Sequence, residues 1–391
     1  MTGWIQDVSL RLFLNMALLR RSGIYSNGFG QIISVPTCGS SQRKDNMDFQ
    51  KLRIGIAGYG VVGKRRRQFI DLNFNMVTVA VSDSNFNQEG TAPDGVKFYP
   101  TYQGLFNEKL DVLFVSLPNY LAAEATIAGL ERGIHVFCEK PPGRSVQDIR
   151  DVIAAEKKQP HLKLKYGFNH RYHESVKEAK RVIESSQYGE VINLRGIYGK
   201  SSIIPFDKGW RSERQYAGGG ILLDQGIHML DMICYFAGEF EEIKSFVSNN
   251  YWRHDVEDNA YAIMRNQEGC VAMLHSTATQ WQHKFRLEIT LREALLELSG
   301  ILSGTKSYGD ERLKIIPKKD SSSVGSFLEI TNSYLDDNSW QCEVDEFADI
   351  VINDKMVLNG NSGDALKLME LVYRIYCADS RWQEAFNIQR P

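Results

Sequence analysis

Short runs of apolar and β-branched residues alternate with helix-like segments in the first half of the chain. Five runs have the length of strands, at Leu52–Ala57, Met76–Val81, Asp111–Leu117, Ile134–Cys138 and Leu162–Phe168. Helical segments follow them, for example at Tyr120–Arg132 and Val146–Lys157. Strands that alternate with helices at this spacing predict βαβ crossovers and a parallel sheet covered on both faces. We therefore expect a doubly wound α/β domain, which we place at residues 47–172.

The pattern changes after Arg171. It predicts a helix at about His173–Ser185, a strand at Val191–Lys200 and, beyond a glycine-rich loop, a helix at about Ile221–Phe236. Tight turns then separate runs that predict two hairpins, Ala260–Met264 with Cys270–Thr279 and Phe285–Leu291 with Leu295–Ser299. We expect an α+β domain with an antiparallel sheet at residues 173–345. A C-terminal helical segment at 346–391 would contain a last helix at about Ala365–Trp382.

Residues 1–46 stand apart from this pattern. They contain an amphipathic patch at Leu10–Arg21 and then a Gly/Ser-rich run that ends near Lys44. Met47 leads directly into the first predicted strand, so we interpret 1–46 as the product of an upstream start site or as a disordered tail. A targeting segment is the alternative, because Arg-rich, acid-poor leaders can be transit peptides.

Composition narrows the class of protein. A chain of 391 residues exceeds twice the ~150 of one domain. Its 43% hydrophobic and 24% charged residues are typical of soluble globular proteins. The 46 basic residues nearly balance the 48 acidic ones, so we expect no nucleic-acid partner. Six scattered cysteines without a CxxC pair indicate a reducing, cytoplasmic location and no zinc site. No apolar stretch reaches the length of a membrane span, so we expect no membrane insertion.

A glycine loop follows the first predicted strand and opens a helix. Its residues are Gly58, Tyr59, Gly60, Val61, Val62 and Gly63. The first glycine permits a tight turn, the second lets backbone approach a pyrophosphate, and the third lets helix and strand pack closely. Asp83 closes the second strand at the distance where a carboxylate binds the adenosine ribose. Together they predict a dinucleotide site and a Rossmann domain.

Asp83 also bears on which dinucleotide binds. An ionised carboxylate there would repel the 2′-phosphate of NADP, so NAD is favoured and NADP is the less favoured alternative. The basic run Lys64–Arg67 is the counter-evidence, because one of its side chains would be able to meet an additional phosphate. Our preferred interpretation of that run is a solvated face of the first helix.

Lys140 is the first catalytic candidate. The sequence Glu139-Lys140-Pro141-Pro142 follows the fourth predicted strand, at the sheet edge where open α/β folds place ligands. The proline after Lys140 prevents regular continuation of the strand and allows a cis bond, which would fix the direction of the lysine. The alternative interpretation of Lys140 is a surface charge, because that is the more common role of a lysine at a strand end.

Three further polar residues lie in the helix predicted at Ile221–Phe236. Asp224, His228 and Asp231 stand at i, i+4 and i+7, so we expect them on one face of an otherwise apolar helix. Polar groups buried on such a face cost free energy unless they have hydrogen-bond partners, so their presence indicates either such partners or a function. A carboxylate beside an imidazole orients a general base. A divalent-metal site and a purely structural histidine are the alternatives, and we expect no metal.

These motifs together resemble the Gfo/Idh/MocA family of NAD(P)-dependent sugar and polyol oxidoreductases. The resemblance runs from Lys51 to about Trp382 and rests on Gly58–Gly63, Glu139–Pro141, Gly167–Arg171, Trp210-Arg211 and Gly218–Asp231. It implies a Rossmann domain followed by an open antiparallel sheet, a homodimer or homotetramer, and catalytic roles for Lys140, Asp224 and His228. We expect further cofactor contacts at Leu117, Pro118, Asn119, Glu139 and Lys140. We expect substrate contacts at Asn169, Arg171, Trp210, Arg211, Asp224 and His228.

Our hypothesis for the reaction is hydride transfer between NAD and a secondary alcohol carbon. His228 takes the hydroxyl proton because an imidazole titrates near ~6.5, whereas a lysine near ~10.4 would need strong desolvation to act as a base. Lys140 stays cationic and stabilises developing alkoxide charge. Asp224 orients His228 or holds a neighbouring hydroxyl. Trp210 either stacks on a sugar face or packs in the core.

The substrate is the least defined part of the prediction. A sugar nucleotide or amino-sugar intermediate of surface-polysaccharide building comes first, ahead of a free polyol. Arg171 and Arg211 would suit a diphosphate or a carboxylate. Two other functions remain open: redox-assisted elimination or glycoside cleavage with a bound, recycled NAD, and cofactor sensing without turnover.

Overall fold

The computed structural model describes residues 24–26, 32–34, 51–200, 209–303, 306–319 and 328–391. The chain forms two units, residues 1–49 and residues 50–391. In the first unit, strands β1 (Ile24–Ser26) and β2 (Ile32–Ser34) pair antiparallel. The patch at Leu10–Arg21 and the alternative start at Met47 lie outside the described residues.

The first sheet of the larger unit has seven strands. Their order is β5-β6-β4-β3-β7-β8-β9, and all neighbours run parallel except β5 and β6. The strands are β3 (Leu52–Ala57), β4 (Met76–Ser82), β5 (Gly90–Thr91), β6 (Lys97–Tyr99), β7 (Val112–Val115), β8 (His135–Glu139) and β9 (Leu164–Gly167). The five predicted strands and their parallel arrangement are confirmed. Strands β5 and β6 were not predicted because they are too short to show a pattern.

Helices cover both faces of this sheet. On one face lie α2 (Val61–Leu72) and α8 (Ser339–Ile352), and Phe347 of α8 packs on the stacked rings of Phe114 and Phe137. On the other face lie α3 (Asn119–Glu131) and α4 (Val146–Glu156). A helix from the end of the chain therefore completes the first domain, and the predicted division after residue 345 falls inside α8.

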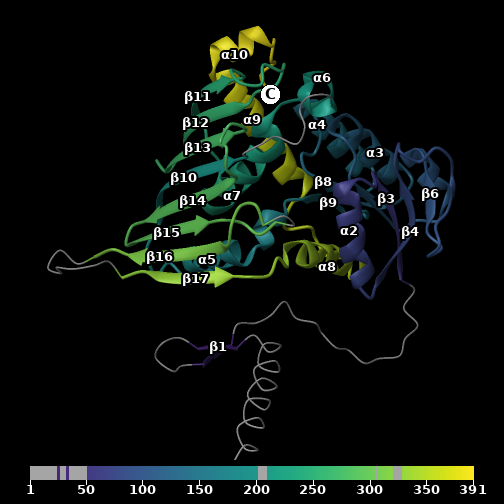
Figure 1. Cartoon of the computed structure of the whole chain (residues 1–391), viewed down its shortest axis with the longest axis horizontal. Helices are drawn as coiled ribbons and strands as arrows, with labels where there is room; N and C mark the ends of the chain where they lie inside the picture. Colours follow the sequence, from purple (N-terminus) through teal and green to yellow (C-terminus); the bar gives the residue numbers. More distant parts are fainter. Residues whose placement is uncertain (1–23, 27–31, 35–50, 201–208, 304–305, 320–327) are drawn as a thin grey trace, which may run out of the picture. The chain divides into compact units, whose positions relative to one another are not determined.

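The second sheet has eight strands in the order β11-β12-β13-β10-β14-β15-β16-β17 (Figure 1). They are β10 (Val191–Gly199), β11 (Glu242–Ser248), β12 (Asn259–Arg265), β13 (Val271–Thr277), β14 (Lys284–Leu291), β15 (Ala294–Ser299), β16 (Glu311–Pro317) and β17 (Ile330–Tyr334). Neighbours run antiparallel except β10 and β13. Both predicted hairpins are present, as β12–β13 and β14–β15.

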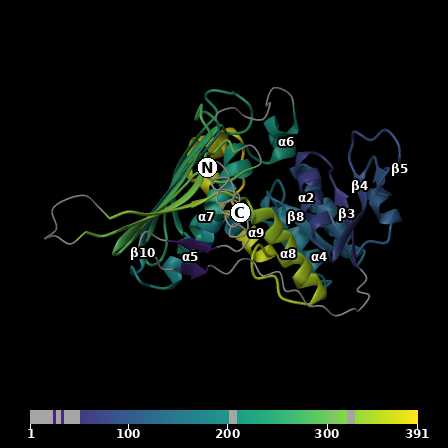
Figure 2. The ribbon, with the colours of Figure 1, turned by 60° about the horizontal axis from the view of Figure 1, so that its bottom comes forward.

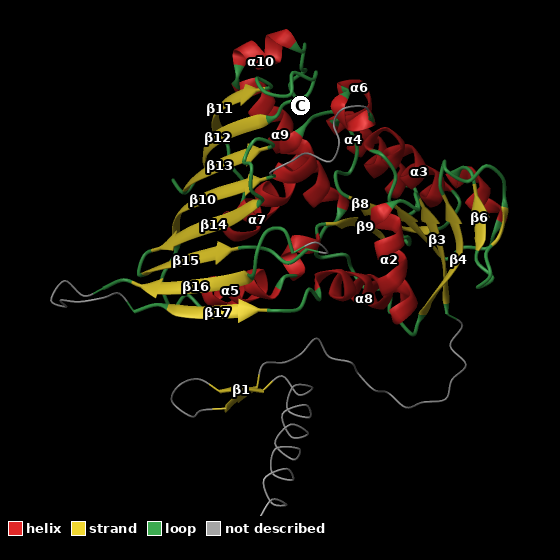
Figure 3. Cartoon of the chain, viewed as in Figure 1, coloured by secondary structure: helices red, strands yellow, loops and turns green. Residues whose placement is uncertain are grey.

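Helices pack on one face of the second sheet, the side that faces the first sheet in Figure 2. They include α5 (Glu174–Glu184), α7 (Ile227–Ala237) and α9 (Ser362–Ala378). A Cβ on Gly196 of β10 would lie 2.7 Å from the Met229 side chain of α7, so the close packing of α7 requires glycine. Helix α9 contacts β11 of this sheet and β9 of the first, and Figure 3 shows it between them.

Two predicted helices differ from the structure. The helix predicted at Ile221–Phe236 begins with a wider π-type turn, Leu222–Gly226, before α7 starts at Ile227. The helix predicted at Ala365–Trp382 is two helices, α9 and α10 (Ser380–Ala385), because Asp379 ends the first and caps the second through a 3.2 Å bond from the Trp382 N–H. None of the helices in the described part of the chain is both long and apolar enough to span a membrane.

Candidate active site

The glycine loop has the geometry that a dinucleotide requires. Gly58 has φ +89°, and a Cβ there would lie 2.4 Å from the Ser116 carbonyl oxygen. A Cβ on Gly63 would lie 1.9 Å from the Gly58 carbonyl oxygen, so glycine is needed where α2 leaves the strand. Around Gly60, by contrast, no described atom would lie within 4 Å of an added Cβ. The loop is therefore tightly packed on the inside and open on the outside, where a pyrophosphate would approach the N terminus of α2.

Two buried hydroxyls beside the loop also fit a ligand. Ser82 Oγ at the end of β4 and Ser116 Oγ just past β7 are buried, and neither has a hydrogen-bond partner among the described residues. Buried polar groups are normally paired, so unsatisfied ones mark positions that a ligand or water completes. Asp83 follows Ser82, and its Oδ1 accepts bonds from the Asn85 backbone N–H at 3.0 Å and the Asn85 side chain at 2.6 Å. The residues present fit a bound dinucleotide.

In the basic run after the loop Lys64 is exposed, but the three arginines pair with protein groups and do not form a solvated helix face. Arg66 is fully buried, where its Nε lies 2.5 Å from Glu139 Oε1 and its second terminal nitrogen 2.6 Å from Glu343 Oε2. Arg65 pairs with Asp337. Arg67 bonds to Tyr59, Asp71 and Asp94. These arginines hold protein carboxylates, and Glu139, expected at the cofactor, is itself held by Arg66.

Lys140 directly follows β8, and its peptide bond to Pro141 is cis. Its ammonium donates a 2.6 Å hydrogen bond to the Asp224 backbone carbonyl and lies 3.9 Å from Asp224 Oδ1. Burial lowers the pKa of Lys140, and Asp224 and Glu139 oppose that shift. The structure thus brings the end of β8 and the π turn together, as expected for one site.

Asp224 contacts lysines and not the imidazole. Lys140 approaches Oδ1, and Lys200, just past β10, approaches Oδ2 at 3.8 Å. Burial alone would raise the pKa of this carboxyl, but Lys140, Lys200 and Arg211 overcome that effect and hold it below its usual value. Asp224 is therefore ionised. Among the described residues no hydrogen bond joins this carboxylate to His228, so the orienting role of Asp224 stays a prediction.

His228 stacks on a second histidine. Its ring lies 3.8 Å from that of His170, centroid to centroid, with the planes at 14°. Its Nδ1 is buried without a hydrogen-bond partner in the described structure. Burial, together with His170 and Lys140, holds the pKa of His228 well below its usual value. The imidazole is therefore neutral near pH 7 and is able to accept a proton.

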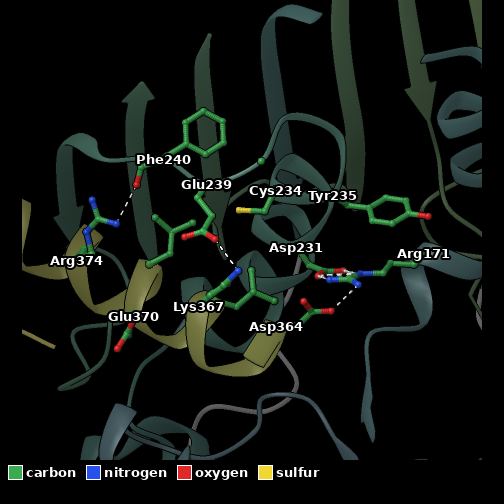
Figure 4. Close-up of a pocket in the computed structure, with 13 residues that line it drawn as sticks. Arg171, Asp231, Cys234, Tyr235, Glu239, Phe240, Asp364, Lys367, Glu370 and Arg374 are labelled. Carbon is green, nitrogen blue, oxygen red and sulfur yellow. Dashed lines mark hydrogen bonds and ion pairs between the residues drawn. The ribbon is translucent and has the colours of Figure 1, made fainter. Parts of the chain in front are cut away.

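Asp231 and Arg171 belong to a different cluster, which Figure 4 shows. Arg171 lies 2.5 Å from Asp231 Oδ1 and 2.8 Å from Asp364 Oδ2 of α9. These residues line a cavity of about 320 Å³ between α7 and α9. The pairing with Asp231 and Asp364 engages the guanidinium, so Arg171 ties the two helices together and lies outside the cluster around Asp224. Asp231 likewise does not join Asp224 and His228.

The remaining predicted residues lie either beside α8 or around a small pocket at the candidate site. Asn169 is buried, and it donates to Ser339 at 3.2 Å and contacts His170 at 3.2 Å, so it links the turn after β9 to α8. Leu117 and Pro118 precede α3, and Asn119 donates a 2.7 Å bond to the Ala217 carbonyl. Asn119 lines a small pocket at the candidate site, together with Trp210, Arg211, Ala217, Gly219, Gly220 and Asp224.

A buried glutamate holds the loop that leads into the π turn. Glu257 accepts bonds from the Gly220 N–H at 2.8 Å and the Leu222 N–H at 2.9 Å, and Tyr376 of α9 donates to it at 2.7 Å. A Cβ on Gly220 would lie 2.0 Å from the Glu257 carbonyl oxygen. The glycine run is thus needed for close packing, and Glu257 fixes the position of Asp224.

Sequence reasoning missed three residues of the site. Lys200 ends a predicted strand, and His170 lies inside the Asn169-His170-Arg171 motif. Their places in the sequence are therefore the only local indication that they belong to the site. His170 Nε2 lies 3.1 Å from the hydroxyl of Tyr198, which is buried on β10. No local pattern in the sequence indicates that these three segments meet.

The fold and the site define a class of protein, the dinucleotide-binding oxidoreductases with a Rossmann domain and a second α+β domain. Residues 52–168 match the model of an oxidoreductase family with an NAD-binding Rossmann fold. Residues 176–297 match the GFO/IDH/MocA C-terminal domain model. The two matches together cover more than half of the chain, which belongs to the Gfo/Idh/MocA family.

Several curated relatives act on sugars. The chain is 33% identical over 141 residues to levoglucosan dehydrogenase of Pseudarthrobacter phenanthrenivorans, 36% of each protein. It is 29% identical over 215 residues to D-glucoside 3-dehydrogenase of Escherichia coli, 53% of this chain and 60% of that protein. These alignments span less than two thirds of either relative. A solved levoglucosan dehydrogenase in complex with NADH has a TM-score of 0.73 at 19% identity, over 85% of this chain and 98% of that one, and so shares the fold.

Proposed function

We propose that this chain is an NAD-dependent oxidoreductase that moves a hydride between the nicotinamide and a secondary hydroxyl or ketone of a sugar, sugar nucleotide or polyol. One observation carries the proposal. The Lys140 ammonium donates to the Asp224 backbone carbonyl at 2.6 Å and lies 3.9 Å from the Asp224 carboxylate, where the strands of a dinucleotide-binding sheet end. The names of the relatives support the sugar or polyol part of the proposal.

The protein's residues supply the proton chemistry. NAD held at the glycine loop of Gly58, Gly60 and Gly63 would supply the hydride chemistry. His228 accepts the hydroxyl proton during oxidation, because its lowered pKa keeps the imidazole neutral. Lys140 donates a hydrogen bond to the substrate oxygen and stabilises negative charge that develops there. Asp224 keeps Lys140 charged and in place, since burial alone favours the neutral amine.

The finer substrate assignment is a sugar nucleotide or amino-sugar intermediate of surface-polysaccharide building in the cytoplasm. Its support is a relative named putative UDP-kanosamine synthase oxidoreductase subunit, from Amycolatopsis mediterranei, with 27% identity over 250 residues. No two cysteines within the described ranges form a disulfide, which favours a reducing compartment.

The experiment that tests this function follows NADH formation by its absorbance. The full chain is incubated with NAD or NADP and a panel of free polyols, sugar phosphates, sugar acids and UDP-, GDP- and dTDP-sugars. We expect one substrate class to reduce NAD, and NADP to react more slowly because of Asp83. Cofactor binding without reduction by any member would contradict the proposal. Substrate consumption with a retained, recycled NAD would instead identify the elimination or glycoside-cleavage reaction.

We also propose that the chain forms a homodimer or homotetramer through the uncovered face of the second sheet. Residues alternate between buried and exposed along β11, β12 and β13. The exposed positions carry large apolar side chains at Phe246, Tyr261, Ile263, Val271 and Met273, and Phe246 is 79% exposed. An exposed apolar patch of this kind is typical of an interface.

Sedimentation equilibrium tests the interface directly. The wild type is expected to sediment as a dimer or tetramer. A Phe246→Glu/Ile263→Glu double variant is expected to dissociate, because it places charge in an apolar contact. The exposed Leu358→Glu substitution, outside this sheet, is the matched control. A monomeric wild type would contradict the proposal.

A further inference from the structure

The candidate site holds more positive than negative charge. Asp224 is the common neighbour of three cations: Lys140 at 3.9 Å, Lys200 at 3.8 Å, and Arg211, which lines the same small pocket. Glu139 is the next acid, but Arg66 holds it at 2.5 Å. The nearby His170 and His228 are held neutral by burial and add no charge. One carboxylate therefore faces three cationic side chains.

Two of these cations are weakly engaged by the described protein. Lys140 already donates to the Asp224 carbonyl. The side chain of Lys200 is only 11% exposed, and its 3.8 Å ion pair with Asp224 is longer than a hydrogen bond. Arg211 Nε is buried without a partner in the described structure, and its guanidinium lies 4.3 Å from the Trp210 ring centroid. A buried charged donor without an acceptor is unfavourable, so Arg211 needs an acceptor, and the long ion pair leaves Lys200 able to donate to the same group.

We infer that the substrate carries an anionic group, a phosphate or carboxylate, which Lys200 and Arg211 bind. An anion supplies both the missing acceptors and the missing charge, and arginine binds such groups through two parallel hydrogen bonds. The inference rests on the proposed function and narrows it to sugar phosphates, sugar acids and sugar nucleotides. Neutral polyols are then poor substrates.

The geometry also indicates where the anion lies relative to the reacting alcohol. Lys140 and Lys200 approach opposite oxygens of the same carboxylate. An alcohol bound at Lys140 and an anion bound at Lys200 would therefore both lie beside this one carboxylate. This proximity favours an anionic substituent on the ring that is oxidised, as in a sugar monophosphate or a uronic acid.

The test compares substrates that differ only in charge. NADH formation is measured with glucose, glucose 6-phosphate and glucuronate, and with UDP-glucose, whose anionic group is a diphosphate. We expect kcat/KM to be at least about tenfold higher for an anionic sugar than for glucose, which is the effect of one charge-assisted hydrogen bond. The Lys200→Met and Arg211→Met variants should each reduce this ratio by about tenfold.

Arg292→Met is the matched control. Arg292 is 62% exposed, pairs with Glu190 and lies at the opposite end of β10 from Lys200. This substitution removes one positive charge outside the site, so the ratio of kcat/KM between an anionic sugar and glucose should stay unchanged. Melting curves verify that each variant folds.

The outcomes separate the inference from the proposed function. Equal kcat/KM for glucose and its anionic forms, unchanged in both variants, would overturn the inference and leave the function standing. If no sugar reduces NAD, the function fails, and calorimetric titration with glucose 6-phosphate and glucuronate decides the anion site. Binding that weakens at least about tenfold in Arg211→Met would support the site. Absence of binding by both would overturn it.

Discussion

Replacing His228 with alanine is expected to lower kcat by about 10²- to 10⁴-fold, the usual contribution of a general base. The buried imidazole stacks on His170 at 3.8 Å and is neutral because burial lowers its pKa. It is the group best suited to accept the hydroxyl proton. NAD affinity should change little, since the glycine loop lies on other elements. Steady-state kinetics on the preferred substrate, with NADH fluorescence titration for binding, measures both effects.

The pH dependence provides an independent check on His228. A protonated imidazole does not accept a proton, so activity is lost as pH falls through the pKa of His228. Because that pKa lies well below 6.5, kcat/KM should still be near its plateau at pH 6.5 and decline only under more acidic conditions. His161→Ala, which removes an exposed histidine, is the control. Full activity of His228→Ala at neutral pH would exclude this role.

The second large effect is on stability. Arg66→Met is expected to lower the free energy of unfolding by about 3 kcal/mol, the low end of the range for breaking a buried ion pair. Methionine leaves Glu139 and Glu343 without their partner, and Glu343 is fully buried. The low end applies because burial raises the pKa of Glu343 to about 7 even beside Arg66, so this carboxyl neutralises readily. Urea unfolding measures the change.

A double variant isolates the cause. Glu343→Gln added to Arg66→Met removes the orphaned carboxyl and should recover part of the lost stability, because a neutral amide is less costly to bury than a charge. Arg150→Met is the matched control, since Arg150 is 46% exposed and pairs with Glu370 at the surface. Equal losses of unfolding free energy in Arg66→Met and Arg150→Met would show that the buried ion pairs stabilise the fold no more than a surface ion pair does.

The parts of the fold that the sequence predicted are those with local signals. Strand β7 is a continuous apolar run, and β3 and β8 are mostly apolar. Gly58 and Gly63 are required by close contacts with Ser116 just past the neighbouring strand and with Gly58 itself. The two-residue strand β5 has too little sequence to show a period.

The parts of the site that the sequence did not predict depend on distant contacts. Asp224 lies in a π turn that precedes the α-helix of His228, and no residue pattern distinguishes that turn from an α-helix. Arg171 was expected at the substrate and is held by Asp364, almost 200 residues further along the chain. Lys200 belongs to the site only because β10 ends beside Asp224.

Deuterium transfer tests the central claim most directly. The sugar that reacts fastest in the panel is prepared with deuterium on its ring carbinol carbons and incubated with the full chain and NAD for a single turnover. Mass spectrometry then reads the reduced nicotinamide. The account predicts one deuterium on the nicotinamide, and much slower transfer in His228→Ala. Substrate conversion with no deuterium on the nicotinamide at any time would contradict hydride transfer by this protein.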